Sequence, residues 1–494
     1  MKRASGILLP IASLPSRYGI GTFSRCAYDF VDFLERAGQR YWQILPLGPT
    51  GYGDSPYQSF STFAGNPYFI DLDQLAEEGL LSEEECEAID AQEDGQYIDY
   101  QKLYETRFDI LRKAYERSSL AEKPEYQDFL EENKEWLEDY CLFMAVKDWF
   151  GGKSFAEWDE DIRLRRPEAV ERFRELLAEE IDFYRFQQFY FQKQWYRLKK
   201  YANSHGVEII GDIPIYVAFD SADTWSEPAL FQFDENGTPS AISGCPPDGF
   251  SATGQVWGNP LYDWEYHEKT GYAWWIKRMR RCFRLYDIVR VDHFRGFDEY
   301  FSIPYGQDTA QGGHWAKGPG IALFHALQKE LGETRIIAED LGFLTDSVIR
   351  FVRDTGYPGM KVLEFAFDSR EESNYLPHTY TQNCVAYTGT HDNQTVVGWF
   401  RSLPEEDYRM AVRYLDLKRE DENEINWKMI RTVLASVADT AIIPIQDYLG
   451  LDDAARINTP SKLGGNWIWR MKKNALTEEM EKKIRELTEL YGRC

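Results

Sequence analysis

The sequence predicts a (β/α)₈ barrel with large insertions. Three observations support this prediction: short apolar runs bounded by turn residues recur along the chain, helical patterns separate them, and several runs end in polar or charged residues. Apolar runs that alternate with helices are typical of strands in a parallel sheet. Eight such runs close most simply as a barrel, with an active site at the carboxyl ends of the strands.

The eight predicted strands are short and lie between turn signals, at residues 6–15, 41–49, 207–217, 287–294, 335–342, 360–367, 383–392 and 441–450. Helical patterns follow the first strand and precede the third and the fifth. We therefore expect one decorated barrel over the whole chain, residues 1–494.

The spacing of the strands is uneven, and the excess residues predict three insertions. Residues 66–205 are mainly helical in pattern and are expected to form a helical subdomain. Residues 218–263 are rich in Gly, Pro, Asp and aromatic residues, which predicts a long substrate-binding loop. Residues 296–320 carry glycines on both sides of a Trp and are expected to form a mobile loop.

Composition limits the class of ligand. The 494 residues carry a formal net charge of −26, which argues against nucleic acid and anionic membranes as partners because both would repel the protein. Aromatic residues make up 15% of the chain and can stack on sugar rings, although core packing explains any single ring about equally well. A neutral ligand is therefore expected.

Cysteine usage predicts a cytoplasmic location. The seven cysteines are scattered and form no CxxC pair, so we expect reduced thiols. The first residues lack a signal-peptide cleavage pattern, and no stretch approaches the roughly 20 apolar residues that span a bilayer.

Acidic residues at the ends of five predicted strands are candidates for chemistry: Asp212, Asp292, Glu339, Asp392 and Asp447. Cleaving a glycosidic bond requires one acid to protonate the leaving oxygen and one carboxylate to attack or stabilise the anomeric carbon. A helix cap or structural ion pair explains any single acid better, but five converging acids favour catalysis.

Neighbouring residues indicate how two of these acids would differ. Arg290 shares strand parity with Asp292, so we expect a guanidinium beside that carboxylate that keeps it ionised. Glu339 follows an apolar run that would raise its pKa and hold a proton. Asp340 stays an open alternative, because both faces of a barrel strand are buried.

Two of the seven histidines, His293 and His391, adjoin the predicted acids. We expect His391, as a neutral imidazole, and Asp392 to hydrogen-bond sugar hydroxyls. A metal site is the competing explanation, but HExxH, CxxC and calcium-loop spacings are absent, so no metal or other cofactor is expected. The sequence also lacks GxSxG and GxxxxGK[ST], which argues against a serine triad and a phosphate-binding loop.

Three segments resemble the catalytic regions of the α-amylase superfamily: RVDHF, IIAEDLG and TGTHDN. Further segments narrow the resemblance to amylomaltases, the disproportionating enzymes of glycoside hydrolase family 77: SLPSRYGIG, GYGDSPYQSFSTFAGNPYFIDL, GDIPIYVAFDSADTW, GCPPDGFSATGQVWGNPLYDW and GGHWAKGPG. The resemblance runs from about residue 5 to about residue 470. It implies a 4-α-glucanotransferase that acts on maltooligosaccharides and α-1,4-glucans, passing a glucan segment to the 4-hydroxyl of glucose or another glucan with retention.

The resemblance also implies residue roles. Asp292 would be the nucleophile, Glu339 the general acid/base and Asp392 the transition-state stabiliser, which decides between Glu339 and Asp340. The implied substrate-binding residues are Ser55, Tyr57, Asp212, Phe250, Gln255, Trp257, Asn259, Arg290, His293 and His391. Phe250 replaces the tyrosine often found in this loop, which keeps a stacking ring but removes a hydroxyl contact.

Two alternative functions stay open on sequence alone. An α-1,4-glucan hydrolase shares the first half-reaction, so the catalytic acids cannot separate it from a transferase. A catalytically silent glucan-binding barrel is the other alternative, because a fold does not guarantee a function. The presence of all three acids argues against it.

Overall fold

The computed structural model describes residues 2–51, 53–89, 95–247, 252–342, 344–370, 373–418 and 424–494. A parallel sheet forms its centre, and the strands of this sheet lie at the eight predicted positions. They are β1 (Ala4–Leu8), β2 (Tyr41–Gln43), β3 (Glu208–Pro214), β6 (Ile288–Asp292), β9 (Ile336–Ala338), β10 (Gly359–Val362), β11 (Cys384–Tyr387) and β12 (Thr440–Pro444).

The first and last strands are shorter than predicted. Both runs contain a proline, which cannot donate a hydrogen bond to a sheet ladder. The run that begins with β1 passes Pro10 into the 3₁₀ turn Ile11–Ser13, and β12 ends at Pro444, where the short helix α18 (Ile445–Tyr448) starts.

The sheet curls into a nearly closed barrel with the strand order β10-β11-β12-β1-β2-β3-β6-β9. Two hydrogen bonds join its ends in place of a ladder. The Ala338 amide donates to the Pro358 carbonyl at 2.9 Å, and the Met360 amide donates to Asp340 Oδ1 at 2.7 Å. The predicted (β/α)₈ class is therefore confirmed.

The barrel interior is a packed core and not a pore. Each of the eight strands contributes a buried side chain to one interior cluster, as expected for this architecture. These residues are Leu8, Tyr41, Ile210, Ile288, Ile337, Met360, Val385 and Ile442. The alternate residues of the strands, such as Ile7 and Ile443, belong instead to the cluster that packs against the surrounding helices.

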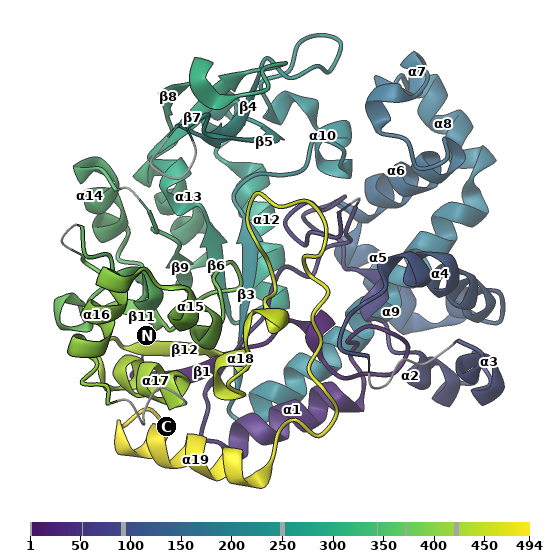
Figure 1. Cartoon of the computed structure of the whole chain (residues 1–494). Helices are drawn as coiled ribbons and strands as arrows, with labels where there is room; N and C mark the ends of the chain where they lie inside the picture. Colours follow the sequence, from purple (N-terminus) through teal and green to yellow (C-terminus); the bar gives the residue numbers. More distant parts are fainter. Residues whose placement is uncertain are drawn as a thin grey trace.

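Amphipathic helices surround the sheet (Figure 1). They include α1 (Arg25–Arg36), α12 (Ala273–Leu285), α13 (Ile321–Leu331), α14 (Asp346–Thr355), α15 (Val396–Ser402), α16 (Glu405–Tyr414), α17 (Ile425–Ala435) and α19 (Glu478–Leu490). In α1 the buried residues Ala27, Phe30, Val31 and Leu34 recur at helical spacing, which fixes the face turned to the core. Among the described residues, no helix is both long and apolar enough to cross a membrane.

Helices fill the chain between β2 and β3, in the region predicted as a helical insertion. They are α2 (Leu72–Glu77), α3 (Glu83–Glu87), α4 (Tyr100–Glu116), α5 (Pro124–Asn133), α6 (Leu137–Trp149), α7 (Glu160–Arg163), α8 (Pro167–Leu176) and α9 (Ala178–Ser204). The long α9 packs against α6 and also against α1 and β3, so it connects the insertion to the barrel (Figure 1).

The two segments expected to be loops form a second sheet instead. β4 (Ala241–Cys245) and β5 (Gln255–Pro260) come from the 218–263 insertion, which also holds α10 (Ala222–Ser226). β7 (Glu299–Pro304) and β8 (His314–Lys317) come from the 296–320 insertion, and the helix α11 (Trp264–Lys269) follows β5. The strands pair antiparallel in the order β5-β4-β7-β8, so each insertion supplies half of the sheet.

A strap, residues 449–476, crosses from the barrel to the helical insertion (Figure 1). The Met471 amide donates to the Ser13 carbonyl, and the Tyr100 hydroxyl donates to the Trp467 carbonyl at 3.1 Å. These contacts hold the strap over the carboxyl ends of the strands.

Candidate active site

Strand parity directs three predicted acids toward the barrel mouth. Asp212, Asp292 and Glu339 each lie an even number of residues beyond an interior side chain of their own strand, so they point to the same side of the sheet as that side chain. The strand register then makes them neighbours. Asp212 lies opposite Arg290 across β3 and β6, and the pairing of β6 with β9 brings Glu339 next to Asp292.

Arg290 joins two of these acids, as the shared parity predicted. Its Nη1 donates to both oxygens of Asp212 at 2.8 and 2.7 Å, and its Nη2 donates to Asp292 Oδ1 at 2.9 Å. Burial alone would lower the pKa of Arg290, but Asp212 and Asp292 raise it well above its usual range. Asp212 is fully buried, whereas the Asp292 side chain keeps 32% of its surface exposed. Asp292 is thus the acid of this network that a ligand can reach.

Glu339 is in position to hold a proton beside Asp292. Its two oxygens accept hydrogen bonds from the backbone amides of His293, at 2.7 Å, and Leu341, at 2.8 Å. Burial and then the negative charge of Asp292 raise the pKa of Glu339 to about 7, although Arg290 and the two amides act in the opposite direction. A carboxyl group with this pKa can both give and take a proton near neutral pH.

Asp340, the alternative acid, closes the barrel instead. Its Oδ1 accepts the Met360 amide, and its carboxylate lies so close to Gly359 that a Cβ there would be 2.4 Å from Oδ2. Asp340 points to the opposite side of the strand from Glu339.

Asp392 forms an ion pair with its neighbour His391. The Nε2 of His391 lies 3.3 Å from Asp392 Oδ2. Burial opposes ionisation of Asp392, but His391 and a hydrogen bond from Asn458 hold the pKa of Asp392 well below its usual range. Burial would also lower the pKa of His391, yet Asp392 raises it. The neighbouring carboxylate thus shifts the pKa of His391 in the direction of the protonated ring, whereas the expectation was a neutral imidazole.

Asn458 and Arg456, in the strap, contact Asp392 and were not predicted. Asn458 Nδ2 donates to Asp392 Oδ1 at 2.6 Å, and Arg456 Nη2 donates to the Asp392 carbonyl at 2.7 Å. Arg456 Nε also donates to the Asn458 carbonyl at 2.7 Å. The strap shows neither helical nor strand periodicity in its sequence. The one signal for these two residues was that both are polar and lie in a loop after the last strand.

Tyr57 connects the two halves of the site. Its ring stacks on His391 with centroids 5.2 Å apart, and its hydroxyl donates to Asp212 Oδ2 at 3.0 Å. The Ser55 hydroxyl accepts a hydrogen bond from the Tyr57 amide and so stabilises the turn that carries this ring. The ring of Trp467, in the strap, lies 5.8 Å from the ring of Tyr57 between centroids and extends the aromatic wall. Trp467 was also not predicted from the sequence.

His293 and the 250s segment form the opposite wall. Burial, with a smaller contribution from Arg295, lowers the pKa of His293 to about 3, so its ring is neutral. Trp257 meets this ring edge-on at 4.8 Å, and its indole N–H donates to Gln255 Oε1 at 3.1 Å.

Two further residues predicted to bind substrate here, Asn259 and Phe250, are not seen in this wall. Asn259 is buried and donates to the Val217 carbonyl at 2.8 Å, so it ties the small sheet to the chain after β3. Phe250 lies outside the described residues.

Asp447 is not part of the site, and its inclusion among the converging acids is wrong. Its Oδ2 accepts the Thr388 hydroxyl at 2.6 Å, and its Oδ1 accepts the Val396 amide at 2.9 Å. Val396 is the first residue of α15, so Asp447 caps a helix, which was the structural alternative for any single acid.

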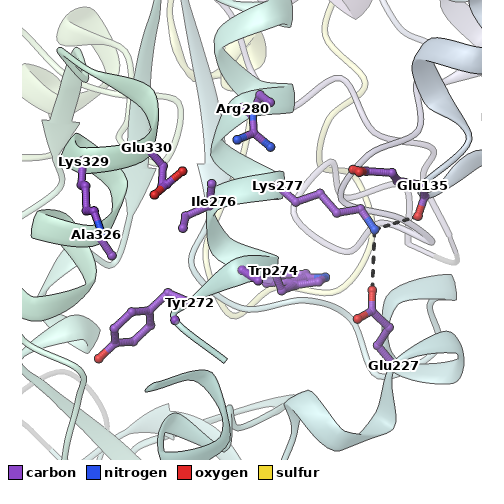
Figure 2. A pocket seen from close by; sticks show the side chains of 12 residues that line it. Glu135, Glu227, Tyr272, Trp274, Ile276, Lys277, Arg280, Ala326, Lys329 and Glu330 are labelled. Carbon is purple, nitrogen blue, oxygen red and sulfur yellow. Dashed lines mark hydrogen bonds and ion pairs between the residues drawn. The ribbon is translucent and has the colours of Figure 1, made fainter. Parts of the chain in front are cut away.

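A pocket of about 920 Å³ lies outside the barrel and contains none of the predicted residues (Figure 2). Its lining residues come mainly from α12, the two residues before it and α13. Lys277 there donates to the Glu135 carbonyl at 2.7 Å and lies 3.7 Å from a Glu227 oxygen. In the part of the chain that the structure describes, no group of three or more His, Cys, Asp or Glu residues could hold a metal ion.

Comparison with known proteins identifies the family. The family model described as 4-alpha-glucanotransferase, of glycoside hydrolase family 77, matches residues 9–477. The chain belongs to this family. Similar proteins include the 4-alpha-glucanotransferases of Streptococcus pneumoniae, 52% identical over 100% of this chain and 98% of that protein, and of Clostridium butyricum, 51% identical over 98% and 99%. The solved amylomaltase from Streptococcus agalactiae, in complex with acarbose, superposes with a TM-score of 0.96 and 44% identity over the full length of both chains.

These comparisons confirm the resemblance seen in the sequence and the 4-α-glucanotransferase activity that it implied. The hydrolase and the silent binding barrel are not favoured. Amylomaltase from Corynebacterium glutamicum, 20% identical with a TM-score of 0.79, shares the fold over 99% of this chain and 74% of its own.

We expect Asn458→Ala to lower kcat of the transferase roughly 10- to 100-fold. The substitution removes a hydrogen bond to a charged carboxylate, which is typically worth about 1.5–3 kcal/mol. Steady-state transfer assays would measure the loss. Asn203→Ala is the matched control, because Asn203 donates to Asp287 at 2.8 Å at the opposite end of the barrel. Equal losses in both variants would contradict a role for Asn458 at Asp392.

Proposed function

We propose that this transferase disproportionates maltooligosaccharides and α-1,4-glucans through a covalent intermediate on Asp292. The observation that carries the proposal is that Asp292, which accepts a hydrogen bond from Arg290, lies beside a second carboxyl group, Glu339, whose pKa is about 7. A retaining displacement needs a nucleophilic carboxylate and a proton-carrying carboxyl group side by side.

In the first step, a carboxylate oxygen of Asp292 attacks the anomeric carbon of the donor. The glycosidic bond breaks, and the proton of Glu339 passes to the leaving 4-oxygen. In the second step, ionised Glu339 takes the proton from the 4-hydroxyl of an acceptor glucan, which attacks the same carbon and breaks the ester bond to Asp292. Two inversions give net retention.

The other residues support the charge that develops on the sugar ring. Ionised Asp392, held by His391 and Asn458, would stabilise the oxocarbenium-like transition state and bind ring hydroxyls. Tyr57 would form a flat wall beside the ring, and Asp212, fully buried, would act through Arg290 and Tyr57. We assign Ser55, Gln255 and Asn259 to supporting these walls, and His293 to the acceptor side with Trp257.

Transfer predominates over hydrolysis only if an acceptor sugar is bound where water would otherwise attack. We propose that Trp257 provides this binding. Trp257→Ala is expected to raise the ratio of glucose released by hydrolysis to glucose released by transfer at least about threefold, measured on maltotriose. Trp149→Ala is the control, because Trp149 is 57% exposed on the helical insertion. An unchanged ratio would remove Trp257 from the explanation.

The product profile on maltotriose tests the proposal as a whole. Transfer yields glucose together with oligosaccharides longer than maltotriose, whereas hydrolysis yields glucose and maltose alone. Longer products that carry a label from the non-reducing end of the donor, joined through an α-linkage, would support transfer with retention, as the double displacement requires. Absence of any product longer than maltotriose would refute transfer.

We also propose that the protein works in the cytoplasm and binds neither nucleic acid nor membranes. None of its seven cysteines, all of which the structure describes, forms a disulfide, and the net charge of −26 opposes polyanionic surfaces. Recovery of the protein in the cytosolic fraction, with thiols that react after denaturation without a reductant, would test the location.

A further inference from the structure

Glu364 is a buried acid that the mechanism does not use. It lies in the 3₁₀ turn Leu363–Ala366, directly after β10, and only 7% of its surface is exposed. Among the described atoms, its Oε1 has no hydrogen-bond partner. An acid buried in this way costs stability, so its presence at the carboxyl end of a barrel strand calls for a role.

The side chain packs under the segment that carries Asp392, residues 388–393, which we call the catalytic loop. The Glu364 amide donates to the Thr388 carbonyl at 3.1 Å, so the turn and the loop are joined through their backbones. A Cβ built on Gly389 would lie 2.9 Å from Glu364 Oε1, closer than side-chain carbons approach other atoms. Glycine at this position therefore lets the carboxyl group touch the backbone of the loop.

Arg456 also holds the loop. This residue donates to the Asp392 carbonyl at 2.7 Å, and its charge lowers the pKa of Glu364. Burial and then the charges of Asp447 and Asp453 have the larger effect and raise the pKa of Glu364 well above its usual range. The shift favours an uncharged carboxyl group, which adds no further negative charge behind Asp392.

We propose that Glu364 is a positioning residue for the transferase reaction: its side chain fixes the turn at Gly389 and thereby the place of His391 and Asp392. The proposal rests on the role assigned above to Asp392. Asp392 would face the sugar, and Glu364 would hold the backbone that carries Asp392 in place. Glu364 itself does not touch the substrate.

Three variants test this role on the full-length protein. Glu364→Ala removes the support, and we expect kcat on maltotriose to fall roughly 10- to 100-fold with KM within threefold, because a catalytic group misplaced by about 1 Å loses rate of this order. Glu364→Gln keeps the shape without a charge and should restore kcat to within threefold of wild type. Asp71→Asn is the matched control, since Asp71 is a buried acid that caps α2 away from the site.

The outcomes separate the possibilities. Asp71→Asn is expected to lower the melting temperature without lowering kcat. The same result in Glu364→Ala would overturn the proposal. An inactive Glu364→Gln would also overturn it. Asp392→Asn, assayed in parallel, tests the role of Asp392 independently: if that variant keeps its activity, the assignment of Asp392 fails. A crystal structure of Glu364→Ala then decides on positioning alone. A shifted catalytic loop supports the proposal, and an unmoved loop refutes it.

Discussion

Asp292→Asn is expected to lower kcat for transfer from maltotriose by at least roughly 10⁴-fold, or about 5.4 kcal/mol of activation free energy. The amide oxygen of asparagine is a poor nucleophile, so the covalent ester cannot form and the oxocarbenium-like transition state loses its nearest negative charge. Binding should survive, because Arg290 keeps both contacts to Asp212. Calorimetric titration with maltotriose should give a Kd within about threefold of wild type.

Asp340→Asn is the matched control for this variant. Asp340 is also an acid at the carboxyl end of a barrel strand, but its side chain accepts the Met360 amide, which an asparagine side-chain oxygen can also do. We expect this control to keep kcat within about tenfold of wild type. If Asp292→Asn retained more than about 1% of kcat while Asp340→Asn lost activity, the nucleophile would have been assigned to the wrong acid.

The central strands of the barrel were predictable because burial on both faces leaves a strong local signal. The residues at which the strands end were harder to predict. The prolines at positions 10 and 444, at the ends of the first and last strands, show the reason. An apolar run continues through each proline, but a ladder cannot, so helical turns replace the predicted strand residues. Only hydrogen bonding, which the apolar pattern does not record, separates the two conformations.

The acids were predictable as a set but not one by one. The choice between Glu339 and Asp340 depends on which alternate residues face the barrel axis, and both sets are apolar in the sequence. Asp447 also follows a barrel strand, yet its carboxylate accepts a hydrogen bond from the first amide of the neighbouring helix α15 and is not available to the site. The partner that decides each case comes from a distant segment.

Long-range pairing accounts for what the sequence analysis missed. The second sheet forms only because β4 pairs with β7, which belongs to the next insertion. Asn458 reaches Asp392 from 66 residues away, and Glu364 lies in an apolar run where an acid is not expected. Such contacts leave no periodic trace in the segments that make them.

Glu339→Gln is expected to lower kcat roughly 10²- to 10⁴-fold, the usual contribution of general acid/base catalysis. The amide cannot protonate the leaving 4-oxygen in the first step or deprotonate the acceptor in the second. Glu208→Gln, at the opposite end of β3 and paired with Arg335, is the control and should leave kcat within twofold of wild type. A Glu339→Gln variant with normal kcat would contradict the assignment.

The pH profile gives an independent test of the same residue. Glu339 must carry its proton to begin the reaction, and because burial and Asp292 raise its pKa to about 7, the protonated fraction falls tenfold for each pH unit above that value. Wild-type kcat/KM should therefore decline on the alkaline side of pH 7, and the residual activity of Glu339→Gln should not. A donor with a fluoride leaving group needs no proton for its departure, so its first step should recover in the variant. An alkaline decline that persists in Glu339→Gln would assign the titration to another group.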